Sequence, residues 1–447
     1  MNGRKLSDIN IPFLGMRLGD FFVGSRAIWF IVILLMAVSL CVIFSASSMK
    51  AFAAWNAGGR FFGFFGKHLL FMSLSMLLMV ILSHVPMRYW QSPVYAFLFL
   101  IAMVFLLCIV PLVGEEINGA RRSLRIFGLS LQPSEFVRLA LINFVAVLLT
   151  QAKYYGSRKS FKWIAIATLF CCAVIFLENI STAVILGATI YILCFFGGAY
   201  KPWMRRTGLL ALVGSVLVVG MIIAMPDTTK DGSNEHGVTK VLGKVGRSST
   251  GIARIQRFKS QCFAPINDHT YSDLSGVDLQ VVSSQRAIAN SKLIGVGPGN
   301  SELRNFLPEA YSDFVFAIIV EEYGVGGAIA VLFIYIMLFY VISRVAKFAT
   351  TPHARLFALG IGVIILLQAI IHMLICVNLF PITGQNLPFI SRGGSSYLVT
   401  AAYFGILLRI SEDRKIAERQ MAAVATEDEQ IVPVRMERIP EREETEL

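Results

Sequence analysis

Long apolar segments dominate this chain and leave few folds open to it. Hydrophobic residues make up 56% of its 447 residues, and charged residues only 15%. A transmembrane helix needs about 17 to 25 predominantly apolar residues. Ten such segments are centred near Leu35, Leu77, Met103, Phe144, Thr168, Thr189, Val216, Phe333, Ile364 and Phe404. Because lipid cannot satisfy backbone polar groups, we predict an all-α polytopic membrane protein with about ten transmembrane helices.

Basic residues in the short loops indicate the orientation of these helices. Three loops on the side of the N-terminus are basic, at residues 153–162, 201–206 and 344–355. We therefore expect both termini to lie in the cytoplasm, on the inner side of the membrane. Arg121, Arg122 and Arg125 go against the rule, since they lie on the predicted outer side.

Changes in composition along the chain predict three parts. Residues 1–27 form a cytoplasmic N-terminal segment, residues 28–409 a membrane domain, and residues 410–447 a charged tail that we expect to be disordered. The membrane domain includes one large extracytoplasmic loop at about 227–312. A connection this long is usually functional or disordered.

The formal net charge of +12 limits the partners. A basic excess can attract nucleic acid, anionic lipid headgroups or a phosphorylated substrate. In so apolar a chain we expect membrane lipids and a phosphorylated substrate, and no nucleic acid. The histidines and cysteines are scattered, so their spacing does not predict a metal site.

The segment Gln132–Glu135 reads as the start of a helix, because proline suits the first helical position. Glu135 and Arg138 are then neighbours on one face, at i and i+3. Such a pair near a membrane interface faces the bundle interior or a water-filled cavity. A structural ion pair and a functional one both stay open. The arginines just upstream favour an anion, since the guanidinium fork suits phosphate.

A second segment, residues 375–398, cannot form one continuous helix. Its helix breakers are Pro381, Gly384, Pro388, Gly393 and Gly394. Irregular backbone at membrane depth is tolerated only where protein buries it or where it lines a cavity. Its small residues indicate close backbone packing or the approach of a ligand. A simple exposed loop is the alternative.

A third segment places three carboxylates at the start of a long apolar run. Asp313 opens the run, and Glu321 lies about 12 Å further along a helix at about 1.5 Å per residue. Glu322 points to nearly the opposite side. We expect Asp313 to act as a general base at the mouth of a cavity. For Glu321 and Glu322, structural pairing and function are both open, and we favour internal ties. Glu309 is expected to shape the mouth.

Four motifs together resemble one family. NGARRSL with QPSEFVRLA, ENISTA, FLPEAYSDFVFAIIVEEYG and PITGQNLPFISRGGSS occur in order between about Ile28 and Arg409. They resemble the SEDS proteins (shape, elongation, division and sporulation), which include FtsW and RodA, and are most similar to the division member FtsW. The family implies a ten-helix bundle that polymerises lipid II outside the bacterial cytoplasmic (inner) membrane. Its partners are a class B penicillin-binding protein transpeptidase and other division proteins, at the septum.

The resemblance also implies residue roles. Asp313 matches the family's essential aspartate, and Arg122 matches the arginine of its GAxRW motif, although Ser123 replaces the tryptophan. Arg138 replaces a lysine of the family, and Arg392 a common tyrosine. The candidate substrate-binding residues are Arg121, Arg122, Gln132, Glu135, Arg138, Glu309, Ser391, Gly393 and Gly394.

The expected activity is an inverting glycosyl transfer, which needs a base for the acceptor hydroxyl and cations for the leaving pyrophosphate. A divalent cation, Mg²⁺ or Mn²⁺, stays open as an additional participant. Three alternatives remain: a lipid II flippase, an elongation-type polymerase of the RodA kind, and a non-catalytic scaffold. Polar residues near the midplane would favour the flippase, whereas Arg122, Asp313 and Pro381 fall at the outer ends of their spans.

Overall fold

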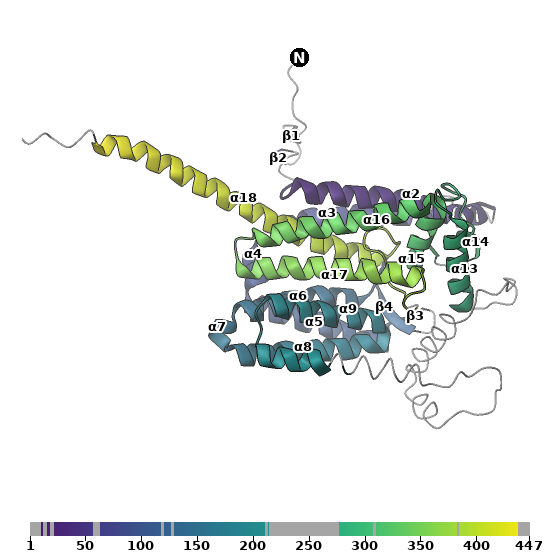
Figure 1. The fold of residues 1–447 in the computed structure, drawn as a ribbon, viewed down its shortest axis with the longest axis horizontal. Coiled ribbons are helices and arrows are strands. Elements are labelled where there is room, and N and C mark those ends of the chain that lie inside the picture. Colours follow the sequence, from purple (N-terminus) through teal and green to yellow (C-terminus); the bar gives the residue numbers. More distant parts are fainter. Residues whose placement is uncertain are drawn as a thin grey trace, which may run out of the picture.

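A computed structural model describes residues 10–11, 16–17, 22–56, 63–117, 120–126, 129–210, 213, 277–306, 310–381 and 384–436. Within these described residues there are nine long helices, and they run side by side as a bundle (Figure 1). They are α2 (Arg26–Asn56), α3 (Gly63–His84), α5 (Pro93–Val113), α6 (Pro133–Thr150), α8 (Ser157–Glu178), α9 (Ile180–Phe196), α16 (Val315–Lys347), α17 (Pro352–Cys376) and α18 (Gly394–Met436). This confirms the predicted all-α class.

The predicted spans coincide with these long helices. Nine of the ten predicted centres fall inside them, and the tenth, Val216, lies outside the described residues. In the part of the chain that the structure describes, seven helices are long and apolar enough to cross a membrane, and α9 is apolar but shorter, at 17 residues. The chain is a polytopic membrane protein.

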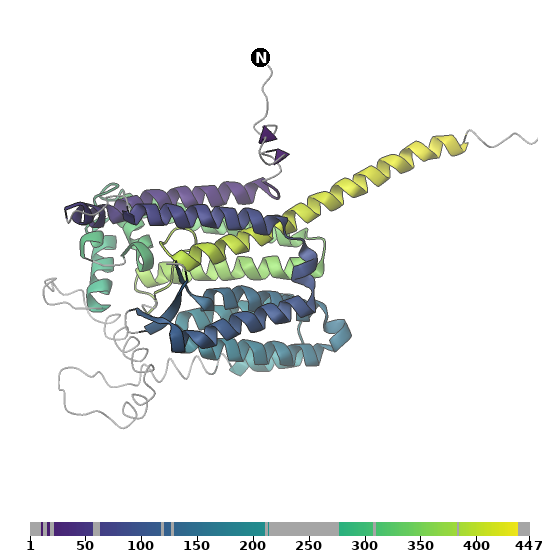
Figure 2. The same ribbon diagram turned by 180° about the vertical axis from the view of Figure 1, so that it is seen from behind.

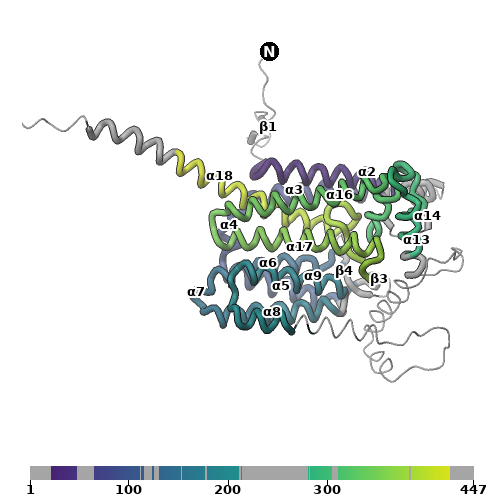
Figure 3. Tube along the Cα trace, viewed as in Figure 1, coloured from purple at the N-terminus to yellow at the C-terminus, as the bar shows by residue number. Residues whose placement is uncertain are grey.

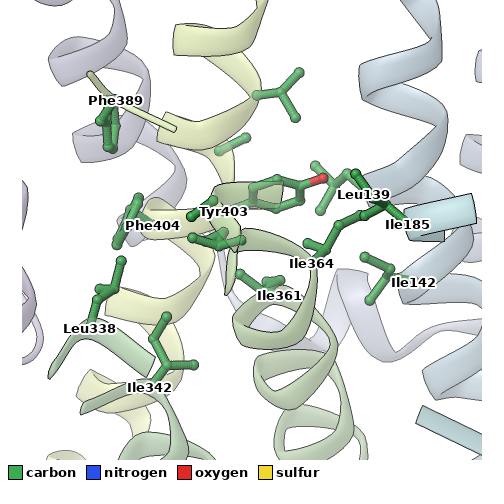
Figure 4. Packing of buried hydrophobic residues seen from close by; sticks show 14 of the residues in the cluster. Leu139, Ile142, Ile185, Leu338, Ile342, Ile361, Ile364, Phe389, Tyr403 and Phe404 are labelled. Atoms are coloured by element: carbon green, nitrogen blue, oxygen red, sulfur yellow. The ribbon is translucent and has the colours of Figure 1, made fainter. Parts of the chain in front are cut away.

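Burial separates inner helices from peripheral ones. The most apolar window of α6 is 83% buried and that of α17 is 61% buried, against 17% for α3 and 22% for α5. Side chains from α6, α9, α16, α17 and α18 meet around the inner pair, as Figure 4 shows for Leu139, Ile185, Ile342, Ile364 and Phe404. The polar residues of α6 and α17 are therefore carried into the interior of the protein.

Short elements gather at the two ends of the bundle. One end carries α4 (Met87–Gln91) and α7 (Ala152–Tyr155). The other end, called the sheet end below, carries α13 (Val277–Asn290), α14 (Leu303–Phe306), α15 (Ala310–Asp313) and an antiparallel sheet (Figure 2). The strands are β3 (Glu115–Ile117), β4 (Ala120–Ile126) and β5 (Leu129–Leu131), in the order β3-β4-β5. A separate hairpin pairs β1 (Asn10–Ile11) with β2 (Met16–Arg17).

The helix α16, which lies beside α17 in Figure 3, is interrupted near the sheet end. Gly324 has φ 65° and ψ −161°, outside the helical region. The amides of Val296 and Gly297 donate to the carbonyls of Glu321 and Glu322 at 2.9 and 3.0 Å. A β-carbon at Gly324 would lie 2.3 Å from the carbonyl oxygen of Leu293. Glycine is therefore required at 324, by its conformation and by the close approach of this turn.

The last helix corrects one prediction. We expected residues 410–447 to be disordered, but α18 continues as a helix to Met436. Its sequence supports a helix beyond the membrane, because the ion pairs Arg409–Asp413 and Arg414–Glu418 have the i,i+4 spacing that stabilises helices. Residues 437–447 lie outside the described part of the chain.

Candidate functional site

The predicted break after α17 is present as an irregular loop of residues 384–393 at the sheet end, called the 384–393 loop below. Residues 385 and 387–391 of this loop are buried. Buried backbone without regular structure has to find hydrogen-bond partners elsewhere. Those partners come from several helices of the bundle.

Several helices contribute hydrogen bonds to the 384–393 loop. Ser39 of α2 donates to the carbonyl of Ile390 at 2.9 Å, and Tyr335 of α16 donates to that of Pro388. His372 of α17 donates from Nδ1 to the carbonyl of Gln385 at 2.6 Å. The Gln385 side chain donates to the Thr182 hydroxyl of α9 at 2.7 Å. The loop is thus fixed to the bundle rather than loosely exposed, as irregular backbone at membrane depth requires.

Three successive residues of α15 contact this loop. The carbonyl of Tyr311 accepts from the amide of Arg392 at 3.1 Å, and the Ser312 hydroxyl donates to Asn386 Oδ1 at 2.9 Å. The Arg392 guanidinium also lies 5.3 Å from the centre of the Tyr311 ring. These contacts fix the backbone that carries Asp313.

The Asp313 carboxylate lies against the backbone of the loop. A β-carbon added at Gly384 would be 3.3 Å from Asp313 Oδ2, and Gly384 has φ +64°. Asp313 is half-buried, whereas Phe314 after it is fully enclosed. A carboxylate that is held in place and still partly accessible is what a general base requires.

The predicted pair of Glu135 and Arg138 is present in the first turns of α6. Arg138 Nη2 lies 3.3 Å from Glu135 Oε1, and the two side chains are only 5% and 7% exposed. Arg138 Nη1 donates to Gln368 Oε1 of α17 at 2.9 Å. Among the described residues, Glu135 Oε2 and Arg138 Nε have no hydrogen-bond partner. The buried pair therefore keeps unused polar atoms.

Glu321 and Glu322 are buried ties at the kink of α16. The Glu321 carboxylate accepts from the Ser301 hydroxyl and from the two backbone amides that follow it, at 3.0 and 3.4 Å. Glu322 accepts from the Ser45 hydroxyl of α2. Both side chains are 1% exposed. These contacts join α16 to the segment before α14 and to α2.

The loop residues predicted to bind substrate serve packing in this structure. The Ser391 hydroxyl accepts from the amide of Leu387 at 2.8 Å, within the loop. A β-carbon at Gly393 would lie 2.7 Å from Asn386 Nδ2, and one at Gly394 would lie 2.8 Å from the Phe71 ring. A side chain at 393 or 394 would displace the end of a neighbouring side chain, so glycine allows the close packing seen here.

The remaining predicted residues differ in how far the structure describes them. Arg121 and Arg122 belong to β4, which lies against α5 and α6 at the sheet end, but their side chains are outside the description. Glu309 lies outside the described residues. Gln132 precedes α6, which begins at Pro133 as predicted, and its side chain makes no capping bond.

Several polar residues near Asp313 escaped the sequence analysis. Gln368, Asn386 and Ser312 bond to one another or to the Glu135–Arg138 pair. The signal for Gln368 was available, because an amide in the middle of an apolar helix is costly unless it has a partner. Ser312 and Asn386 carry no comparable signal in an irregular segment.

The part of the chain that the structure describes contains no group of three or more His, Cys, Asp or Glu side chains able to hold a metal ion. The predicted carboxylates Glu135 and Asp313 belong to different elements, α6 and α15.

A profile of a known family matches residues 25–416. This family is described as cell cycle proteins and comprises FtsW, RodA and SpoVE. The chain belongs to the FtsW/RodA/SpoVE family. The match confirms the family predicted from the four motifs.

Named relatives cover most of the chain. A probable peptidoglycan glycosyltransferase FtsW of Trichlorobacter lovleyi is 29% identical over 396 residues, 87% of this chain and 94% of the relative. Stage V sporulation protein E of Bacillus subtilis is 29% identical over 388 residues, 85% of this chain and 95% of the relative.

Two solved structures share the fold. A chain from a peptidoglycan synthase complex that coordinates polymerization and crosslinking has a TM-score of 0.63 at 21% identity, over 88% of this chain and 98% of that chain. RodA of Thermus thermophilus has a TM-score of 0.56 at 20% identity, over 88% and 97%. These likenesses establish the same family fold.

Proposed function

We propose that this chain is a peptidoglycan glycosyltransferase that polymerises lipid II on the outer face of the bacterial cytoplasmic membrane during cell division. One observation carries the proposal: three successive residues ending in Asp313 dock on the 384–393 loop and leave the carboxylate half-buried at one end of the bundle. Family membership and the relatives named as peptidoglycan glycosyltransferases support it.

In the proposed reaction, an acceptor hydroxyl attacks the anomeric carbon of a lipid-linked donor. A new glycosidic C–O bond forms while the C–O bond to the lipid pyrophosphate breaks. The hydroxyl proton passes to the Asp313 carboxylate, and the pyrophosphate leaves with the bonding electron pair. A single displacement of this kind inverts the anomeric carbon and needs no covalent enzyme intermediate. General base catalysis typically contributes about 10²- to 10⁴-fold.

The leaving pyrophosphate needs positive charge. We assign this role to Arg122, with Arg121 and Arg138, because β4 and the start of α6 lie at the same end of the bundle as α15. Arg138 Nε and Glu135 Oε2, which have no hydrogen-bond partner among the described residues, offer polar atoms for a substrate or for ordered water.

The family also guides the proposed context. We infer that a class B penicillin-binding protein supplies transpeptidation, since one structural neighbour belongs to a peptidoglycan synthase complex. We place the sheet end outside the membrane and both termini in the cytoplasm, with residues 1–27, 28–409 and 410–447 as the three parts of the chain. We further propose the septum as the location and other division proteins as partners, because two relatives named as probable FtsW glycosyltransferases are 29% and 28% identical to this chain.

A lipid II flippase is the competing function. Alternating access uses a site near the membrane midplane, whereas Asp313 and β4 lie at one end of the bundle. The same clustering argues against a scaffold, which needs no half-buried carboxylate held by a structured loop.

One experiment separates these functions. The purified protein, together with its transpeptidase partner, is given fluorescent lipid II in detergent, where no membrane separates two compartments. A polymerase yields glycan strands under these conditions, and the Asp313→Asn variant yields none. Lipid II that moves across vesicles without forming strands would identify a flippase instead.

A further inference from the structure

A chain of hydrogen bonds joins the buried ion pair of α6 to the residue next to Asp313. We propose that Gln368 and Asn386 are positioning residues. Through Ser312 they hold Asp313 at a fixed position relative to the Glu135–Arg138 pair. The inference rests on the proposed function for its activity readout, and its structural content can be tested without that function. It gives two polar residues outside the predicted site a defined role.

The first link is the Gln368 side chain, which uses both ends of its amide. Its Oε1 accepts from Arg138 Nη1 at 2.9 Å, and its Nε2 donates to the carbonyl of Asn386 at 2.9 Å. A guanidinium can only donate and a carbonyl can only accept. The amide therefore has one productive orientation, and a flip would break both bonds. Gln368 is 6% exposed, so water does not readily replace either partner.

The second link is Asn386, which is bonded through backbone and side chain at once. Its carbonyl accepts from Gln368, and its Oδ1 accepts from the Ser312 hydroxyl at 2.9 Å. The close packing of Gly393 against Asn386 Nδ2 fixes the side-chain amide from the other side. A shift of Gln368 therefore moves the acceptor that holds Ser312.

The third link is the short helix α15. Ser312 precedes Asp313, and the carboxylate of Asp313 faces Gly384, two residues before Asn386. Residues 384–386 of the loop thus lie beside both Ser312, which precedes the base, and the carboxylate of the base itself. Misplacement of a reacting group by about 1 Å can cost about 100-fold in rate, so the position of Asp313 depends on this chain of contacts.

Simple packing is the rival explanation. An interior glutamine can be satisfied by its neighbours and do nothing more than stabilise the bundle. The two explanations differ in what is lost: a packing role lowers stability, whereas a positioning role lowers turnover beyond any effect on stability.

Gln368→Met tests this difference, because methionine keeps the length of the side chain and removes both hydrogen bonds. Its matched control is Gln91→Met. Gln91 also bonds to another element, donating to Thr351 at 2.9 Å, but it lies at the opposite end of the bundle. We expect Gln368→Met to lower kcat for lipid II polymerisation about 10- to 100-fold, with KM changed less than about twofold. Gln91→Met should shift the melting temperature by a similar amount and keep the turnover of the wild type.

A double-mutant cycle tests the outer link. Ser312→Ala and Asn386→Leu remove the two partners of one hydrogen bond, and Ser312→Thr keeps the hydroxyl. We expect Ser312→Ala and Asn386→Leu each to lower kcat. The double variant should have a kcat no lower than that of the slower single variant. Ser312→Thr should keep the turnover of the wild type. Ser83→Ala is the control. It removes a hydroxyl that donates to the carbonyl of Val80, far from the site.

Hydrogen–deuterium exchange supplies a readout that needs no activity. We expect Gln368→Met to speed amide exchange in residues 311–316 and 384–392, while Gln91→Met leaves both segments unchanged. If the wild-type protein forms no strands, the proposed function is refuted. The exchange result then tests the chain of hydrogen bonds by itself. Turnover in Gln368→Met within twofold of that of Gln91→Met, or exchange in these segments equal to the wild type, would overturn the positioning role.

Discussion

Asp313 and the pair Glu321–Glu322 lie within one stretch of sequence but in different surroundings. The Glu321 carboxylate is buried and takes three donors from residues 301–303. Asp313 is half-buried, its backbone is held by the 384–393 loop, and its carboxylate faces Gly384. The difference teaches that nearby carboxylates divide their roles by local structure: Glu321 fixes a kink, and Asp313 is presented at the end of the bundle.

The largest expected effect is the loss of activity in Asp313→Asn. An amide cannot take the hydroxyl proton, so we expect polymerisation to fall at least about 10²- to 10⁴-fold. The shape of the side chain is kept, so thermal unfolding in detergent should shift by less than about 2 °C. Labelled lipid II and gel analysis of the strands measure the first quantity. A large fall in melting temperature would instead indicate that Asp313 has a structural role like that of Glu321.

Glu321→Ala should have the opposite profile. Removing this carboxylate leaves the Ser301 hydroxyl and two backbone amides without their acceptor, at about 1 to 3 kcal/mol for each buried group. We expect a marked fall in the free energy of unfolding. Activity measured per folded molecule, at a temperature below unfolding, should fall less than in Asp313→Asn. An unchanged melting temperature would contradict the structural role.

Gly384→Ala should have an intermediate effect on activity. The added methyl group would lie 3.3 Å from Asp313 Oδ2 in a backbone conformation with φ +64°. We expect about tenfold slower polymerisation, since small displacements of a base are costly. Gly299→Ala is the control, because φ is +82° there but no atom lies within 4 Å of the added β-carbon. Equal losses in both variants would attribute the effect to backbone strain alone.

Glu322→Gln should have the smallest effect. The amide oxygen still accepts from the Ser45 hydroxyl, so the tie between α16 and α2 is retained. We expect a change in the free energy of unfolding within about 1 kcal/mol, and turnover close to that of the wild type. A loss of turnover comparable to that of Asp313→Asn would show that the division between the two regions is wrong.

Much of this fold was predictable because membrane helices follow from length and hydropathy alone. Nine predicted centres lie in helices, and the start of α6 at Pro133 and the break after α17 were both anticipated. The helical continuation of α18 was missed, because a charged composition was taken as disorder although its i,i+4 ion pairs favour a helix.

The site was only partly predictable, for a physical reason. Glu135 with Arg138 follows from helical spacing, and Asp313 from a charge beside an apolar run. The bonds of Gln368 to Asn386 and of Asn386 to Ser312 join residues 18 and 74 positions apart along the chain. No local periodicity encodes such contacts, since they depend on how α15, α17 and the loop pack together.

The most direct measurement of the central claim is a comparison of binding with turnover in Asp313→Asn. Lipid II affinity and single-turnover strand formation are measured on the same purified complex with the transpeptidase partner. We expect affinity close to that of the wild type together with no detectable glycosidic bond formation. Strand formation by Asp313→Asn at the native rate would contradict the role of Asp313 as the base.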